Sequence, residues 1–351
     1  MKLVLASQGF TTDKIANEVE KLVGKPLKEI NIAIINEAYV VIPETGDKRW
    51  MIRELSLIEK YIGGTIDFVN LRAYDNAEIK RRLQNADMMY IVGGKQFILP
   101  DLFKETGFDE ILREFAEEKV VMGTSAGANV LGKQIESNEY WKARYGVTNN
   151  QIKNKQLGFV NFNIVPHYKR KDHENWDANF LSNSLKNNPF LVYAVTDEQA
   201  IVYDNGQIYS VGGQVECFGG CENKEKSCGC VVIDNGKILM IRHNEGHWDL
   251  PKGHVEQGET EVETAIREVK EETNVDVEVN EKYRYTLGYS PKENVWKEVV
   301  YFVASKIGGE TQPQLEEVQN VEWVEIAEAI DRFTFDVTRE LVKKAIEDLK
   351  I

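Results

Sequence analysis

Residues 253–275 of this 351-residue chain read GHVEQGETEVETAIREVKEETNV, and they decide the fold of its C-terminal third. Thr260 and Glu263 have the spacing of a capping box, so a helix should begin at Thr260. Apolar residues then recur at the spacing of one buried helix face, at Val262, Ala265, Ile266 and Val269. Asn274 stands where a helix commonly ends in a left-handed residue. The stretch predicts one amphipathic helix.

Three glutamates fall together on one flank of this helix. Glu271 and Glu272 follow Glu268 by three and four residues, so the three carboxylates lie close together and repel each other. Most acidic helix surfaces are solvated faces without a further role. The alternative is a cage for a hard divalent cation, which prefers oxygen ligands.

The residues around the three glutamates resemble the Nudix box. That pattern is Gly, five residues, Glu, seven residues, Arg-Glu, an aliphatic, any residue, Glu-Glu, any residue, Gly and an aliphatic. The last glycine is here Asn274, which tolerates the same backbone conformation. The other defining positions match, at Gly253, Glu259, Arg267, Glu268, Val269, Glu271, Glu272 and Val275. The resemblance implies an α/β/α Nudix fold and a metal-dependent pyrophosphohydrolase that cleaves a nucleoside diphosphate linked to another group.

The same resemblance implies roles for individual residues. A Mg²⁺ or Mn²⁺ cofactor would be held by Glu268, Glu271, Glu272, Glu317 and the backbone carbonyl of Lys252. Glu268 could also be the general base, and Glu316 is the alternative to Glu317. Arg267, Glu259 and Gly253 would orient the glutamates.

Within the family, residues 246–256 and 297–301 look most like diadenosine-tetraphosphate hydrolases. Lys297 could hold a phosphate, Tyr301 could lie beside the nucleotide, and Tyr289 or Tyr285 could stack on a base. His254 is a further substrate-binding candidate. Aromatic residues in such a domain are more often part of the core. Other dinucleoside polyphosphates, diphosphoinositol phosphates and nucleoside triphosphates remain open as substrates.

The first two hundred residues alternate short β-branched runs with helical patterns. This alternation is typical of a mostly parallel sheet with helices on both faces, an α/β fold. Asp204-Asn205-Gly206 and Asp234-Asn235-Gly236 each predict a hairpin turn. A glycine-rich and then charged stretch between them marks a domain junction. We therefore expect domains at 1–215 and 227–351, joined by 216–226.

Gly123-Thr124-Ser125-Ala126-Gly127 follows a predicted strand and precedes a helical stretch. This is the context of a G-x-S-x-G elbow, in which a sharp turn exposes a nucleophilic serine. Such a serine needs a base. Outside the C-terminal domain the histidines are His167, at the end of an apolar run, and His173, among charged residues. His167 is the better candidate.

Here the sequence resembles the peptidase E family of aspartyl dipeptidases and cyanophycinases, from Met1 to about Val215. The resemblance rests on residues 123–129, 166–168 and 91–94. It implies a class I glutamine-amidotransferase-like fold, with Ser125 as nucleophile and His167 as base. Glu139 is the expected acid of the triad, with Asp197 or Glu198 as alternatives. The backbone N–H groups of Gly94 and Ala126 would form the oxyanion hole.

The chain departs from that family at Lys95 and Gln96, where a third glycine and an asparagine are common. The change lies beside the expected oxyanion hole. An alternative is therefore a non-catalytic binding or dimerisation module attached to a Nudix hydrolase. Lys169, Arg170 and Lys171 could hold a substrate carboxylate, although such runs are more often solvated charge. For the C-terminal domain the alternative is a nucleotide sensor without turnover.

Composition limits the partners. The net charge of −14 argues against nucleic-acid binding, and no apolar run reaches the length of a membrane span. We expect a cytoplasmic protein that acts on nucleotide and peptide substrates, with a homodimer left open. Zinc is conceivable at Cys217, Cys221, Cys228 and Cys230, but their spacing does not match paired C-x-x-C knuckles. We expect reduced thiols.

Overall fold

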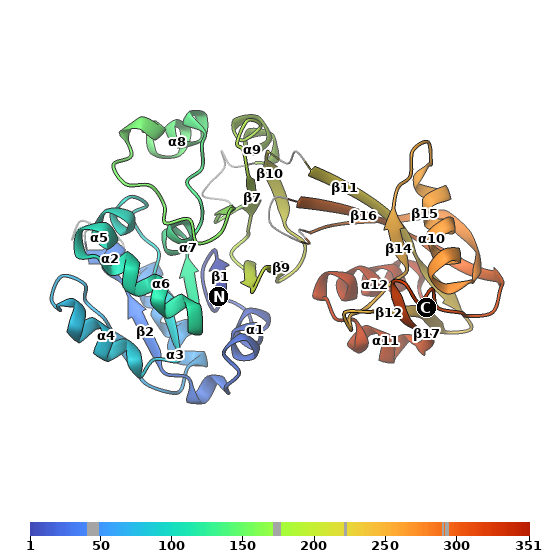
Figure 1. The fold of residues 1–351 in the computed structure, drawn as a ribbon, viewed down its shortest axis with the longest axis horizontal. Helices are drawn as coiled ribbons and strands as arrows, with labels where there is room; N and C mark the ends of the chain where they lie inside the picture. Colours follow the sequence, from blue (N-terminus) through green and yellow to red (C-terminus); the bar gives the residue numbers. More distant parts are fainter. Residues whose placement is uncertain (41–48, 171–176, 221–222, 290, 292–294) are drawn as a thin grey trace. The chain divides into compact units, whose positions relative to one another are not determined.

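The computed structural model describes residues 1–40, 49–170, 177–220, 223–289, 291 and 295–351. The chain separates into two compact units, and the boundary between them falls between Glu222 and Asn223. The first unit carries the N-terminal residues, and the second comprises Asn223–Tyr289 and Val295–Ile351. Each unit is described below by itself (Figure 1).

The main sheet of the N-terminal unit has the strand order β3-β2-β4-β5-β1-β8-β9. The first five strands in this order run parallel to one another, whereas β8 pairs antiparallel with both β1 and β9. The strand bounds are β1 Lys2–Ala6, β2 Ile32–Ile35, β3 Ile66–Phe68, β4 Met88–Ile91, β5 Val120–Thr124, β8 Ala200–Asp204 and β9 Gln207–Val211. The predicted mostly parallel α/β sheet is confirmed.

A smaller sheet in the same unit has the order β10-β7-β6. Its strands are β6 Asn163–Val165, β7 Leu191–Ala194 and β10 Glu216–Gly219. The helices of this unit are α1 Asp13–Val23, α2 Glu37–Val40, α3 Arg49–Tyr61, α4 Asn76–Gln84, α5 Ile98–Thr106, α6 Phe108–Glu118, α7 Ala126–Leu131, α8 Asn138–Tyr145 and α9 Ala178–Ser184, with 3₁₀ turns at Leu27–Glu29 and Asn149–Gln151.

Helices bury both faces of the main sheet. Every residue of β2 and β4 is buried, which requires cover on each side because successive side chains point to opposite faces. Apolar residues of α1 and α3 pack on one face, as part of a single core cluster. On the other side α6 contacts β1 and crosses the sheet in Figure 1. The carboxyl ends of β1 and β5, where Ser7 and Ser125 follow, are therefore held rigidly.

The C-terminal unit is built on one mixed sheet with the order β13-β12-β11-β16-β15, to which β14 and β17 are added. β11 and β16 run parallel over eleven registered pairs, and the other pairs are antiparallel. The strand bounds are β11 Asn223–Asp234, β12 Lys237–His243, β13 Trp248–Asp249, β14 Lys252–His254, β15 Asp276–Tyr289, β16 Val295–Gly308 and β17 Val318–Glu325.

Two layers of helix enclose this sheet. Alternate residues of β11 and β16, such as Val232 and Phe302, pack with α10 (Glu261–Thr273). Their neighbours, such as Val231 and Val303, pack with α11 (Ile326–Arg332) and α12 (Asp336–Leu349). This is the expected α/β/α arrangement, produced by the two-residue period of the strands.

The local signals of the sequence are found where they were expected. α10 begins after Thr260, whose hydroxyl and Glu263 form the capping box, and ends at Asn274 with a φ of 59°. The two hairpins close between β8 and β9 and between β11 and β12, and Asn205 and Asn235 have positive φ there. Each feature depends on only a few neighbouring residues, which is why sequence alone identifies it.

The expected junction at 216–226 differs from the structure. Glu216–Gly219 form β10, which pairs with β7, and β11 already begins at Asn223. Glycine and charge in this stretch suggested a linker, but long-range pairing of β11 with β16 turns its second half into a strand. Cys221, His173 and Lys171 lie outside the described residues.

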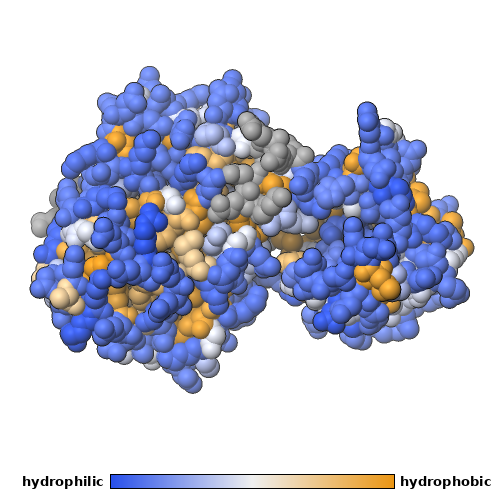
Figure 2. Space-filling model, in the orientation of Figure 1, coloured by the Kyte–Doolittle hydropathy of each residue, from blue (hydrophilic) through white to orange (hydrophobic). Residues whose placement is uncertain are grey.

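The visible face of each unit is mainly hydrophilic, with apolar side chains in patches (Figure 2). None of the helices in the described ranges combines the length and the apolar character that crossing a bilayer requires.

Because each unit has its own core, fragments 1–222 and 223–351 should each fold alone. We expect each to unfold in one cooperative transition on heating, followed by circular dichroism. A fragment that is insoluble or melts without cooperativity would show that the two units depend on each other for folding.

Candidate functional site

Ser125 stands on a sharp turn between β5 and α7. Its backbone has φ 49° and ψ −115°, a strained conformation for a residue with a side chain. A Cβ on Gly123 would overlap the backbone of Gly127, and one on Gly127 would overlap that of Ile91. Both glycines are therefore required by close packing, and this geometry is that of a nucleophile elbow.

His167 and Asp197 complete a chain of hydrogen bonds from Ser125. His167 Nε2 lies 3.1 Å from Ser125 Oγ, and His167 Nδ1 lies 2.7 Å from Asp197 Oδ1. The three residues follow β5, β6 and β7 closely in the chain. This order of nucleophile, imidazole and carboxylate is that of a serine-hydrolase triad.

The expected acid, Glu139, is replaced by Asp197. Glu139 is exposed in the first turn of α8, whereas the imidazole of His167 bonds the carboxylate of Asp197. Asp197 is the alternative that the sequence offers, and a signal for it exists, because it lies three residues beyond the end of the apolar strand β7. Glu139 is nearer to Ser125 in the sequence than Asp197 is, but pairing of β6 with β7 in the small sheet brings Asp197 to His167.

The surroundings of Asp197 favour its ionised form. Burial alone would raise its pKa, but hydrogen bonds from His167 and Ser7 and the nearby charge of Arg170 outweigh burial and lower the pKa below its usual value. Arg170 Nη1 lies 3.9 Å from Asp197 Oδ2. A carboxylate held ionised can orient the imidazole and stabilise it when it is protonated.

A cavity of 790 Å³ opens beside Ser125 and His167. Its lining includes Gly93 and Gly94, the basic residues Arg49, Arg53, Lys95 and Arg170, and the acidic Glu54. The Gly93 N–H is already bonded to Thr124 Oγ1, so Gly94 and Ala126 remain the oxyanion-hole candidates. Sequence reasoning did not identify the contribution of α3 to this lining.

The residues that departed from the family pattern are split between two environments. Lys95 lines the cavity, whereas Gln96 is buried and its Oε1 accepts a 3.4 Å hydrogen bond from Tyr145. Of the two described residues of the basic run, Arg170 lines the cavity and Lys169 does not. Lys169 instead forms an ordinary ion pair with Glu216 at 2.6 Å.

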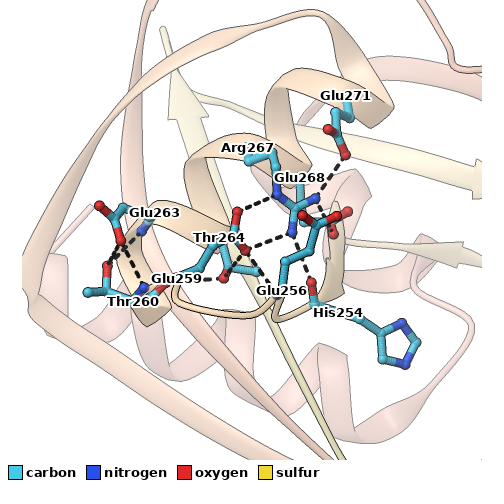
Figure 3. Close-up of polar contacts among 9 residues, drawn as sticks. All are labelled: His254, Glu256, Glu259, Thr260, Glu263, Thr264, Arg267, Glu268 and Glu271. Carbon is cyan, nitrogen blue, oxygen red and sulfur yellow. Dashed lines mark hydrogen bonds and ion pairs between the residues drawn. The ribbon is translucent and has the colours of Figure 1, made fainter.

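In the C-terminal unit, Arg267 holds three glutamates together (Figure 3). Its Nε and Nη2 donate to Glu259 at 2.7 and 3.0 Å, and its Nη1 donates to Glu268 at 2.8 Å and Glu271 at 2.9 Å. Nη2 also reaches the backbone oxygen of His254 at 2.9 Å. One cation therefore fixes α10 against the loop that follows β14.

Glu268 and Glu272 point into the unit. Glu272 is 1% exposed, and its Oε2 accepts the backbone N–H of Lys252 at 2.8 Å. Burial, which the charge of Lys252 only partly offsets, raises the pKa of Glu272 to about 8, and burial likewise raises the pKa of Glu268. A Cβ at Gly253 would overlap the Glu268 carboxylate, which explains why glycine stands there.

The remaining predicted ligand, Glu317, is exposed but close enough for its charge to add to the rise in the Glu268 pKa. In the described ranges, no three His, Cys, Asp or Glu side chains are already arranged as a metal-ligand set. Glu268 and Glu271 instead face Arg267.

The substrate-binding candidates fall into two groups. Lys297 is half-buried, opposite Tyr289 on the paired strand, and burial together with the charge of Lys252 lowers its pKa. His254 is exposed and lies 3.2 Å from Glu225. Tyr301 and Tyr285 are buried in the core, so neither ring can stack on a base. For these two tyrosines the core alternative is the correct one.

The described cysteines lie in ordinary protein environments. Cys228 and Cys230 are free thiols, and Cys217 Sγ lies 3.9 Å from the backbone oxygen of Phe218. Cys228 and Cys230 pack against Ala265 and Val269 of α10, and burial raises their pKa values to about 11 and 12. Both side chains are therefore part of the core that α10 forms with the sheet.

Asp197→Asn should destabilise the N-terminal unit at neutral pH by about 1.5–3 kcal/mol, the contribution of hydrogen bonds to a charged group. Since its folded pKa is lowered, the ionised Asp197 contributes stability above its unfolded pKa of about 3.9 and loses it as pH falls through the folded pKa. The difference from wild type should therefore shrink on acidification. Urea unfolding of fragment 1–222 between about pH 3 and pH 7 measures it.

Glu139→Gln, a variant of an exposed residue, is the control. A pH-independent difference between Asp197→Asn and wild type would contradict the assignment of Asp197.

Comparison with known proteins assigns both units to families. The model of peptidase family S51 matches residues 3–211, and the model of the NUDIX domain matches residues 224–344. The bis(5'-nucleosyl)-tetraphosphatase [asymmetrical] of Caenorhabditis elegans is 36% identical over 129 residues, 34% of this chain and 92% of that protein. Its counterpart from Rattus norvegicus is 32% identical over 127 residues, 32% of this chain and 86% of that protein. An uncharacterized peptidase of Listeria monocytogenes is 31% identical over 111 residues, 30% of this chain and 52% of that protein. The chain is therefore a hydrolase that belongs to peptidase family S51 through its N-terminal unit and carries a Nudix domain as its C-terminal unit.

Proposed function

We propose that this protein is a bifunctional hydrolase with two separate catalytic sites. The C-terminal unit is a Mg²⁺- or Mn²⁺-dependent pyrophosphohydrolase of nucleotides, and the N-terminal unit is a serine peptidase for short peptides. The observation that carries the peptidase is the hydrogen-bonded series Ser125, His167 and Asp197. The cytoplasm remains the proposed compartment, because four cysteines in a chain of this size fit a reducing environment.

The residues of the Nudix site fit a divalent cation. Glu268 and Glu272 are two buried carboxylates, and the charge of Glu268 adds to the cost of ionising Glu272. A hard cation would offset that cost. Glu271, Glu317 and the Lys252 carbonyl are the further ligands we propose. When bound, the cation would activate water for attack on a pyrophosphate phosphorus.

The chain's own groups then have defined tasks. Arg267 keeps Glu259, Glu268 and Glu271 on one side of α10, and the Glu271 side chain would turn from Arg267 to reach the cation. The Lys252 N–H fixes one oxygen of Glu272 and leaves the other for the metal. Glu268, whose pKa burial raises, is suited to accept a proton from the attacking water.

The proposed substrates are dinucleoside polyphosphates. Relatives that match this unit over most of their length are named for hydrolysis of bis(5'-nucleosyl) tetraphosphates. The charge of Lys297 interacts with those of Lys252 and Glu268, and the charge of Lys252 interacts with that of Glu272, so both lysines would attract a polyphosphate chain to these glutamates. Nucleoside triphosphates and diphosphoinositol phosphates are the alternatives that a substrate screen would separate.

In the peptidase site, Ser125 Oγ would attack a peptide carbonyl carbon while its proton passes to His167 Nε2. The imidazolium then protonates the leaving amine, and water hydrolyses the resulting ester and restores Ser125. Asp197 holds Nδ1 throughout, and the N–H groups of Gly94 and Ala126 would bind the developing oxyanion.

The charge of the cavity suggests which peptides enter it. Among the described lining residues, four are basic and only Glu54 is acidic. Glu54 Oε1 accepts hydrogen bonds from Tyr90 and from Thr124 at 2.9 and 2.6 Å, so it is fixed beside the elbow. A substrate with an acidic side chain and a free ammonium group matches this lining, which makes peptides with N-terminal aspartate the first to test.

The alternative for this unit is a binding or dimerisation module. Lys95, which lines the cavity in place of the common glycine, favours it. The triad geometry favours catalysis, since a module that only binds does not need an imidazole between a serine and an ionised carboxylate.

Replacing Glu271 and Glu272 together with glutamine should reduce Mg²⁺-dependent nucleotide hydrolysis by several orders of magnitude, because the amides keep the size but remove charge from the cation's ligands. Glu347→Gln, an exposed glutamate of α12, is the matched control. Phosphate or nucleotide release from diadenosine tetraphosphate measures the rates. Near-normal turnover by the double variant would refute the ligand assignment.

Ser125→Ala should abolish hydrolysis of short peptides with N-terminal aspartate, and His167→Ala should do nearly the same because triad residues act as a unit. Both variants should hydrolyse nucleotides normally. Ser182→Ala, an exposed serine of α9, controls for the substitution itself. Amine release from the peptide is the measurement, and unchanged release by Ser125→Ala would place peptide hydrolysis elsewhere.

A further inference from the structure

Ser7 follows β1 directly and is 1% exposed. Its Oγ donates to Asp197 Oδ1 at 2.6 Å, accepts the backbone N–H of His167 at 2.9 Å, and lies 3.1 Å from His167 Nδ1. Resting on the proposed peptidase function, we propose that Ser7 is a positioning residue that fixes both the backbone of His167 and the Asp197 carboxylate that bonds its Nδ1. It is a fourth member of the Ser125, His167 and Asp197 series.

The backbone of His167 needs such support. Its φ of 63° is in the left-handed region, which is unfavourable for a residue with a Cβ. The Ser7 hydroxyl accepts the N–H of this residue at 2.9 Å and so stabilises the main chain at this point. Ser7 itself is held at the end of β1, between β5 and β8. The sheet thereby sets the direction in which the imidazole leaves the main chain.

The proton of the Ser7 hydroxyl holds in place the carboxylate that sets the tautomer. A hydroxyl has one proton, and here it is donated to Asp197 Oδ1. His167 Nδ1 therefore faces two acceptors, a carboxylate oxygen at 2.7 Å and the Ser7 oxygen at 3.1 Å. The lowered pKa of Asp197 keeps that carboxylate without a proton. Nδ1 must then carry the hydrogen, which leaves Nε2 as the acceptor for Ser125.

Thr11 provides the matched control. Its hydroxyl donates to the backbone oxygen of Asp197 at 2.7 Å, so it holds the same loop without contacting the carboxylate or the imidazole. If Ser7 acted only by supporting the loop, Thr11→Val and Ser7→Ala would have similar effects. If Ser7 acts through the imidazole, the two variants differ.

The test uses the full chain with ¹⁵N-labelled histidine, and His167→Gln identifies the His167 signals. At a pH where the ring is neutral, wild type should show a protonated Nδ1 and an unprotonated Nε2. Ser7→Ala and the nearly isosteric Ser7→Cys should weaken the hydrogen bond between Nδ1–H and Asp197 and shift the Nδ1 resonance measurably. Both should also react with a fluorophosphonate at Ser125 at least about tenfold more slowly. Thr11→Val should behave as wild type, and Ser7→Thr, which restores the hydroxyl, should recover the Nδ1 resonance.

A folded Ser7→Ala or Ser7→Cys protein with the wild-type Nδ1 resonance and labelling rate would overturn the role of Ser7. Equal losses in Thr11→Val would also overturn it, because they would show general support of the loop. Wild-type protein that does not react with the fluorophosphonate would contradict the proposed peptidase function instead, and the Nδ1 measurement would still decide the role of Ser7.

Discussion

Burying a carboxylate costs free energy unless donors or a cation replace the water it loses, and this constraint shapes both sites. Asp197 is compensated by His167, Ser7 and Arg170, and its pKa is lowered. Glu272 receives a backbone N–H and the distant charge of Lys252, and its pKa is raised to about 8. The same chemical group is thus prepared for two uses. One carboxylate orients an imidazole, and the other suits a divalent cation.

The supporting structure follows from these needs. Asp197 can reach His167 because β6 and β7 lie side by side, and Ser125 reaches the same point from β5. In the second unit, Arg267 spans α10 and the loop after β14, and Gly253 leaves room for the Glu268 carboxylate. Each site therefore draws on elements far apart in sequence, while each unit buries its own core.

Local features of the fold could be predicted from sequence, and long-range contacts could not. The capping box of Thr260, the end of α10 at Asn274 and the elbow at Ser125 depend on a few adjacent residues, and the structure contains them. The identity of the acid depends on which strands are neighbours, so the exposed Glu139 was chosen over Asp197. Tyr301 was likewise expected beside the nucleotide but is buried in the core, because periodicity alone does not show which face of β16 meets α12. Ser7 carried no recognisable motif.

The central claim is that one chain holds two hydrolytic sites that work independently. Reacting the intact protein with a fluorophosphonate, locating the label by mass spectrometry and then assaying diadenosine tetraphosphate with Mg²⁺ tests it directly. The account predicts one label per chain, on Ser125, with nucleotide hydrolysis at the rate of unlabelled protein. A chain that takes no label at Ser125, or that loses nucleotide hydrolysis when Ser125 is labelled, would contradict it.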